Sequence, residues 1–84
     1  MTEFQQNTAT LRGQLEKGDI ARICERAACV PNTLYSAWNK TAATELTKTE
    51  KAAYDAFVAF VNERIREKEQ LSAKAAKVAE KLQN

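Results

Sequence analysis

The sequence predicts an all-α protein in which three short helices precede one long C-terminal helix. Of its 84 residues only two are glycine and one is proline. Alanine, glutamate, lysine, glutamine and leucine, which favour helices, crowd the chain. A chain of this length has room for one hydrophobic core. We therefore expect a single domain over residues 1–84, with a head at 7–46 and a long helix at 48–82.

Two short helices are expected in the first third of the chain. The first covers about residues 7–17, and Gly18 ends it in the left-handed conformation that glycine adopts freely. Asp19 then caps a second helix over about residues 20–27. The residues that recur at helical spacing in the first helix are Phe4, Thr8, Leu11 and Leu15.

A third short helix is expected over about residues 31–39. It starts at Pro31, which suits a first helical turn because it lacks the N–H that would be unpaired there. The side chains spaced to face inward are Leu34, Ala37 and Trp38. We expect Trp38 to be mostly buried against the second helix and the start of the long helix, with neighbours among Ile23, Phe57 and Val61.

The long helix begins at a capping box, in which Thr47 and Glu50 satisfy opposite backbone donors. Neither glycine nor proline follows before Asn84. About 35 residues at 1.5 Å each give a helix of roughly 50 Å. A compact domain of this size is roughly 30 Å across. The helix must therefore overhang, bend or find a partner.

The start of the long helix is apolar on all sides. Between residues 52 and 61 only Asp55 is polar in character, which indicates burial on more than one side. We expect this segment to form a homodimer interface made of Tyr54, Phe57, Val58, Phe60, Val61 and Ile65. Farther along, a sparse stripe of Leu71, Ala75, Val78 and Leu82 has coiled-coil-like intervals. The stripe is compatible with a coiled coil and with a solvated helix.

The residue inventory argues against catalysis and metal binding. The chain has no histidine, and Cys24 and Cys29 are its only thiols, too few for a four-ligand zinc site. Gly13 and Gly18 cannot build a glycine-rich phosphate loop. We expect no enzyme, no catalytic residue, no metal and no small-molecule cofactor. The two cysteines are expected to be small buried hydrophobes in a reducing compartment.

The chain also lacks the marks of a membrane or secreted protein. No apolar run approaches the roughly 18 residues of a membrane span, and the N-terminus has no basic and apolar leader. A cytoplasmic location follows as an expectation. The net charge of +2 is too small to identify a polyanion-binding protein by itself.

Short helix, tight turn, short helix is the arrangement that places a second helix in the DNA major groove. Residues 19–39 resemble the helix-turn-helix of lactose-repressor-type regulators and small prophage regulators, with the pattern I-A-x-x-A-G-V-S-x-x-T-V-S-x-x-L-N. The resemblance covers about a quarter of the chain. The matching positions are Ile23, Ala27, Thr33, Leu34, Trp38 and Asn39.

This chain departs from the family pattern at the turn between the two helices. Where the family has Gly-Val-Ser, it has Ala28, Cys29 and Val30. If the turn needs a positive φ there, the Cβ of alanine costs about 1 kcal/mol unless the turn is rebuilt. Losing the serine removes an N-cap worth about 1 kcal/mol, which Pro31 offsets only in part.

The resemblance implies sequence-specific binding to double-stranded DNA and transcription regulation in a bacterium or prophage. Base readout is expected from Asn32, Tyr35 and Ser36. Backbone contacts are expected from Thr33, Asn39 and Lys40. Arg22 and Arg26 are candidates for further phosphate contacts, and ordinary surface charges are the alternative interpretation for both. The alternative is an α-helical protein–protein interaction module that acts through the long C-terminal helix. Salt-dependent binding to duplex DNA distinguishes the two.

Overall fold

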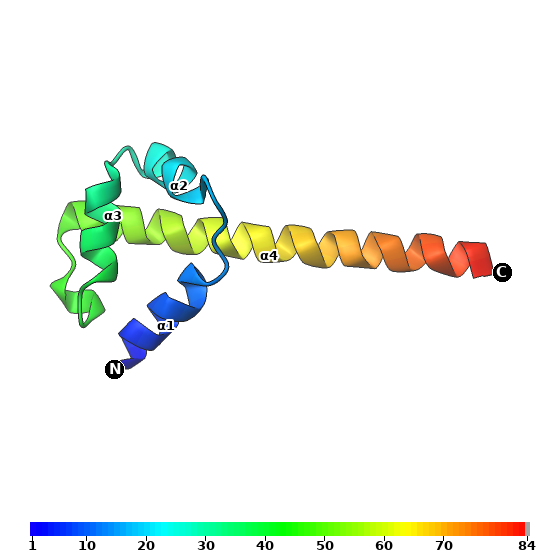
Figure 1. The fold of residues 1–84 in the computed structure, drawn as a ribbon, viewed down its shortest axis with the longest axis horizontal. Helices are drawn as coiled ribbons and strands as arrows, with labels where there is room; N and C mark the ends of the chain where they lie inside the picture. The colour runs from blue at the N-terminus through cyan, green and yellow to red at the C-terminus, as the bar shows by residue number, and fades with distance from the viewer. Residues whose placement is uncertain (84) are drawn as a thin grey trace.

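The computed structural model, which describes residues 1–83, is all-α, as the sequence predicts. Three short helices build a head at one end of a single long helix (Figure 1). They are α1 (Glu3–Arg12), α2 (Asp19–Ala27) and α3 (Pro31–Trp38). A 3₁₀ turn, η1 (Ala43–Glu45), leads into α4 (Lys48–Gln83). The described residues contain no strand.

The first helix lies earlier in the chain than expected. Thr2 and Gln5 form a capping box: the Thr2 hydroxyl accepts from the Gln5 backbone N–H at 3.1 Å, and the Gln5 side-chain Oε1 accepts from the Thr2 N–H at 2.9 Å. The Thr2 hydroxyl also donates to the Thr41 carbonyl at 2.6 Å, which ties the start of α1 to the loop after α3. The expected range of 7–17 is therefore wrong at both ends. α1 stops before Gly13, and a turn follows.

The entry to α2 also differs from the expectation. Gly18 has the left-handed φ of 90°, but it is the N-cap of α2 rather than the end of α1. Asp19 does not cap α2, because its carboxylate is used elsewhere. It accepts from the Glu16 N–H at 2.6 Å and pairs with the Arg64 guanidinium of α4. The carboxylate thus fastens the head to the long helix.

The core lies where α2 and α3 meet the first half of α4. Its buried side chains are Ile23, Cys24, Leu34, Ala37, Trp38, Ala53, Phe57 and Val61. The burial expected for Trp38 is confirmed, with only 5% of the residue exposed. Its ring meets that of Phe57 edge to face, with 5.1 Å between centroids. The Arg12 guanidinium lies over the indole, 4.3 Å from its centroid. The three inward positions expected of α3 are therefore correct.

The turn between α2 and α3 has the strained residue that the departure from the family pattern predicts. Ala28 has φ 53° and ψ 45°, the left-handed conformation that favours glycine. Val30 is the N-cap of α3 and makes no side-chain capping hydrogen bond. Pro31 fills the first helical position, as expected. The turn from α2 to α3 is thus made without the glycine and the side-chain N-cap that would favour it.

The long helix overhangs the head. The expected capping box is present: Glu50 accepts from the Thr47 N–H at 2.9 Å, and the Thr47 hydroxyl accepts from the Glu50 N–H at 3.2 Å. The molecule is 56 Å along its longest axis, and the second half of α4 extends beyond the other helices (Figure 1). Every residue from 65 to 83 is exposed. None of the described helices is long and apolar enough to cross a membrane.

Candidate nucleic-acid interface

The outward face of α3 carries the polar residues that are predicted from the sequence to contact DNA. Asn32, Tyr35 and Asn39 are exposed, and Ser36 is half-buried beside them. The opposite face is locked into the core by the three inward residues already described. Tyr35 also packs on the edge of Trp38, with 5.7 Å between ring centroids. The indole therefore supports the Tyr35 ring from within the domain.

Glu50 of α4 joins two of these residues, a connection that the sequence analysis missed. The Ser36 hydroxyl donates to Glu50 Oε2, and the Lys40 Nζ lies 3.6 Å from the same oxygen. Only 6% of Glu50 is exposed. The capping-box pattern gave Glu50 a local role in α4, and no sequence signal linked it to α3, 14 residues earlier.

These contacts hold Glu50 in its ionised form to lower pH and limit the hydrogen bonds that Ser36 can still make. Hydrogen bonds lower the pKa of Glu50 from 4.5 to about 2. The bond from the Ser36 hydroxyl has the largest effect, and the bond from the Thr47 N–H has the next largest. Glu50 is therefore ionised at neutral pH and offsets part of the Lys40 charge. Since the Ser36 O–H donates to Glu50, the Ser36 oxygen can make further hydrogen bonds only as an acceptor.

A hollow of about 440 Å³ lies between α3 and the start of α4. Asn32, Thr33 and Lys40 line one part of it, and Thr47 and Thr49 line another. The two threonines at the start of α4 were not among the expected site residues. The structure brings them to the same surface because the loop after α3 returns the chain to it.

The two arginines of α2 differ in their freedom to bind a ligand. Arg26 makes a two-point pair with Glu63 of α4, at 2.8 and 2.9 Å, and this pairing raises its pKa. Arg22 is exposed and belongs to none of the ion pairs among the described residues. Arg26 must give up a hydrogen-bonded partner before it can contact phosphate, whereas Arg22 need not.

The expected dimer residues divide into three groups. Phe57 and Val61 are 0% and 1% exposed in the core of their own chain, so they are removed from the expected interface. The head covers one side of this segment and thus accounts for much of its apolar character. Tyr54 and Phe60 are half-buried, whereas Val58 and Ile65 are each 39% exposed. The remaining exposed apolar surface lies on other sides of α4.

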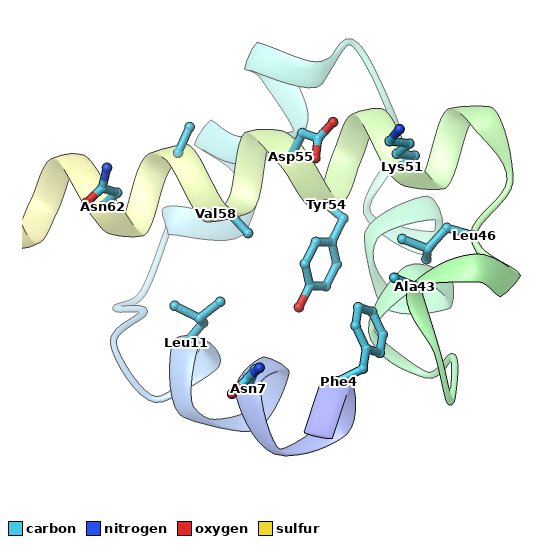
Figure 2. A pocket seen from close by; sticks show the side chains of 11 residues that line it. Phe4, Asn7, Leu11, Ala43, Leu46, Lys51, Tyr54, Asp55, Val58 and Asn62 are labelled. Atoms are coloured by element: carbon cyan, nitrogen blue, oxygen red, sulfur yellow. The ribbon is translucent and has the colours of Figure 1, made fainter. Parts of the chain in front are cut away.

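Part of that surface lines a groove of about 570 Å³ between α1 and α4 (Figure 2). The Tyr54 ring extends from α4 toward α1, and its hydroxyl is hydrogen-bonded to Thr8 at 2.7 Å. Phe4 stacks on the Tyr54 ring with 5.0 Å between centroids. Leu11 and Val58 face the groove from opposite sides (Figure 2). The groove is apolar in its centre and has polar side chains at its rim.

The two cysteines lie at the end of α2 and in the following turn. Cys24 is buried in the core, and Cys29 is half-buried. Burial, with the neighbouring Cys29 thiol, raises the pKa of Cys24 to about 11. Cys24 is therefore a protonated, unreactive thiol at neutral pH. Among the residues described, no three metal-binding side chains come together.

No protein-family model matches this chain, and comparisons with curated proteins and with solved structures give no match.

Proposed function

We propose that this protein binds double-stranded DNA sequence-specifically through α3 and regulates transcription in a bacterium or prophage. The observation that carries the proposal is the division of α3 into two faces. One face is fixed in the core by Leu34 and Trp38, while Asn32, Tyr35 and Asn39 project together from the other. A rigid helix with a clustered polar face suits entry into the major groove.

Each polar residue on this face has a chemical role in the proposal. Asn32 can bond an adenine edge at two points, and Tyr35 can meet a base edge or a thymine methyl. The Ser36 oxygen, whose O–H donates to Glu50, can accept from the amino group of adenine or cytosine. The face thus reads bases through side chains that the domain already orients.

The phosphate contacts are assigned to the edges of the same surface. Thr33, Asn39 and Lys40 flank the base-reading face, and Arg22 offers an exposed cation on α2. Arg26 is a weaker candidate because it is paired with Glu63. Two copies of the chain would supply two such heads to one site, as helix-turn-helix dimers do. The proposed activity is binding rather than catalysis.

The test is selection of duplexes from a random pool, followed by titrations of the selected and a scrambled duplex at several salt concentrations. We expect a preferred sequence, with affinity that falls as salt rises, because phosphate contacts release counterions. Equal binding to both duplexes, or none, would refute sequence-specific recognition by α3.

The exposed second half of α4 favours a second candidate, an interaction module in which the helix-turn-helix is a scaffold. Leu71, Val78 and Leu82 are 68%, 58% and 84% exposed along this half. Binding to a protein partner that is insensitive to salt, without retention on duplex DNA, would support this candidate instead.

A further inference from the structure

One stripe of α4 passes from the buried half of the helix into the exposed half. Its residues are spaced by alternating intervals of four and three, the spacing of a coiled-coil seam. In the first half they are Tyr54, Phe57, Val61 and Arg64, which α2 and the rest of the head cover. After Lys68, the stripe continues with Leu71, Ala75, Val78 and Leu82. Beyond residue 64 nothing in the described chain covers it.

We propose that a second copy of this chain covers the exposed half of the stripe, with the two α4 helices antiparallel. The stripe is narrow: between Leu71 and Leu82, it contains the only leucine and valine side chains. A globular surface would need a wider apolar face, whereas a narrow 4-3 stripe fits another helix with the same repeat. α4 itself has that repeat.

The residues of the stripe are self-complementary in the antiparallel direction. A two-fold axis between Ala76 and Lys77 places Leu71 opposite the partner's Leu82 and Ala75 opposite the partner's Val78. The two-fold axis also generates a second copy of each pair. The interface therefore has four layers, each formed by one apolar residue from each helix. Each small alanine faces the β-branched valine, and each leucine faces a leucine.

The position of the head excludes the parallel direction. The head lies on the same stripe as far as Arg64, only seven residues before Leu71. Seven residues span about 10 Å, and paired helices are also about 10 Å apart. If the two helices were parallel, both heads would lie in the space between the helices just before Leu71. That space is too narrow to hold them. In the antiparallel pair, the heads lie at opposite ends (Figure 1 shows the free half of α4).

The arrangement predicts the distance between the two heads. Phe57, at the centre of the head core, is about 20 residues from the axis, or roughly 30 Å along the helix. The heads are then about 60 Å apart, nearer to two turns of DNA than to the single turn of about 34 Å. This consequence rests on the proposed DNA binding, whereas the pairing itself does not.

Cysteine cross-linking tests the pairing and its direction. In a background with Cys24→Ala and Cys29→Ser, whose helical content is checked first, Leu71→Cys and Leu82→Cys are introduced singly and together. The two sites are about 16 Å apart in one helix, too far for a disulfide within the chain. We expect covalent dimers on oxidation with oxidised glutathione only when both cysteines are present. Efficient dimer formation by either single variant would establish the parallel pair and overturn the proposal.

Sedimentation equilibrium of the unaltered chain gives an independent test. We expect dimers to form as the protein concentration is raised to about 500 µM. Val78→Glu should abolish the dimer, whereas Ala76→Glu, on another face of the exposed half, should not. Added salt should strengthen the pairing, since Lys74 lies beside the partner's Lys81. A strict monomer throughout this range would refute the pairing. If the unaltered chain is a strict monomer but still binds a half-site duplex, the pairing fails while the proposed DNA binding stands.

Discussion

The Ser36 hydroxyl donates a hydrogen bond to the buried carboxylate of Glu50, and this bond joins the exposed face of α3 to the first turn of α4. Glu50 also accepts from the Thr47 N–H and attracts Lys40 at 3.6 Å. One carboxylate thus caps the long helix, orients a proposed base-reading residue and restrains a proposed phosphate ligand. The stability of the fold and the shape of the candidate interface therefore depend on the same group.

Substitution of Glu50 by glutamine should separate these roles. Loss of the charge weakens the bonds to Ser36 and Thr47, so the melting temperature should fall. It also frees Lys40 and removes a negative charge beside the proposed phosphate positions, so binding to random duplex should strengthen several-fold. Thermal melts and titrations of a scrambled duplex measure the two effects. Unchanged or weaker binding to random DNA would place Lys40 away from the phosphates.

Tyr35 and Lys40 should fail differently when each is replaced by alanine. Tyr35→Ala should cost about 1–3 kcal/mol at the preferred site and little on random DNA, because a base contact is lost. Lys40→Ala should weaken both complexes alike and lower the salt slope by about one unit. The readout is the ratio of specific to random binding at several salt concentrations. If Tyr35→Ala leaves that ratio unchanged, α3 does not read bases.

The ion pair of Asp19 with Arg64 should make stability depend on acid pH. The hydrogen bond from Arg64 is the main cause that lowers the pKa of Asp19 from 3.8 to about 2. A lowered pKa means that the pair stabilises the fold fully above about pH 4 and loses this effect as the pH falls through 2. Asp19→Asn should destabilise the protein by about 3 kcal/mol at neutral pH, since it leaves Arg64 without its partner.

Melting of both proteins between pH 7 and 2 provides the measurement for Asp19. The difference between them should shrink below pH 4. Arg26→Gln is the matched control, because its pair with Glu63 lies in solvent, and its melting should change little. A difference that stays constant down to pH 2 would show that the Asp19 carboxylate contributes through shape rather than charge.

Trp38 should be essential for packing, but its N–H should not. Trp38→Ala removes a buried indole and should cost about 3–5 kcal/mol. The Trp38 Nε1 is buried without a hydrogen-bond partner among the described residues. Trp38→Phe should therefore cost much less, because it retains the ring contact with Phe57 and removes an unpaired donor. Urea unfolding followed by circular dichroism compares them, and equal losses would contradict this account.

The two left-handed residues should respond in opposite directions to exchange of alanine and glycine. Ala28→Gly relieves the strain at φ 53° and should stabilise the protein by about 1 kcal/mol. Gly18→Ala introduces the same strain at φ 90° and should destabilise it by about 1 kcal/mol. A Cβ on Gly18 would meet no atom within 4 Å, so the effect isolates the backbone. Melting shifts of the same sign would contradict the assignment.

Local chemistry in the sequence was sufficient for the helix types, the start of α4 and the two faces of α3. The capping box at Thr47 and Glu50 and the i, i+3, i+4 spacing that ends at Trp38 involve residues within one turn of each other, which sequence spacing reports directly. The expected range of α1 is wrong because the Thr2–Gln5 capping box starts the helix earlier, and Gly18 caps α2 instead of ending α1.

The sequence by itself determined an all-α chain with a long helix that outruns its head, because composition, caps and periodicity act over short distances. Only the tertiary structure decided which partners the charged groups take: Asp19 with Arg64, Ser36 with Glu50, and Arg26 with Glu63. It also decided that Phe57 belongs to the core of its own chain rather than to an interface. These contacts join residues 14 to 45 positions apart, and they form only when the head closes on α4.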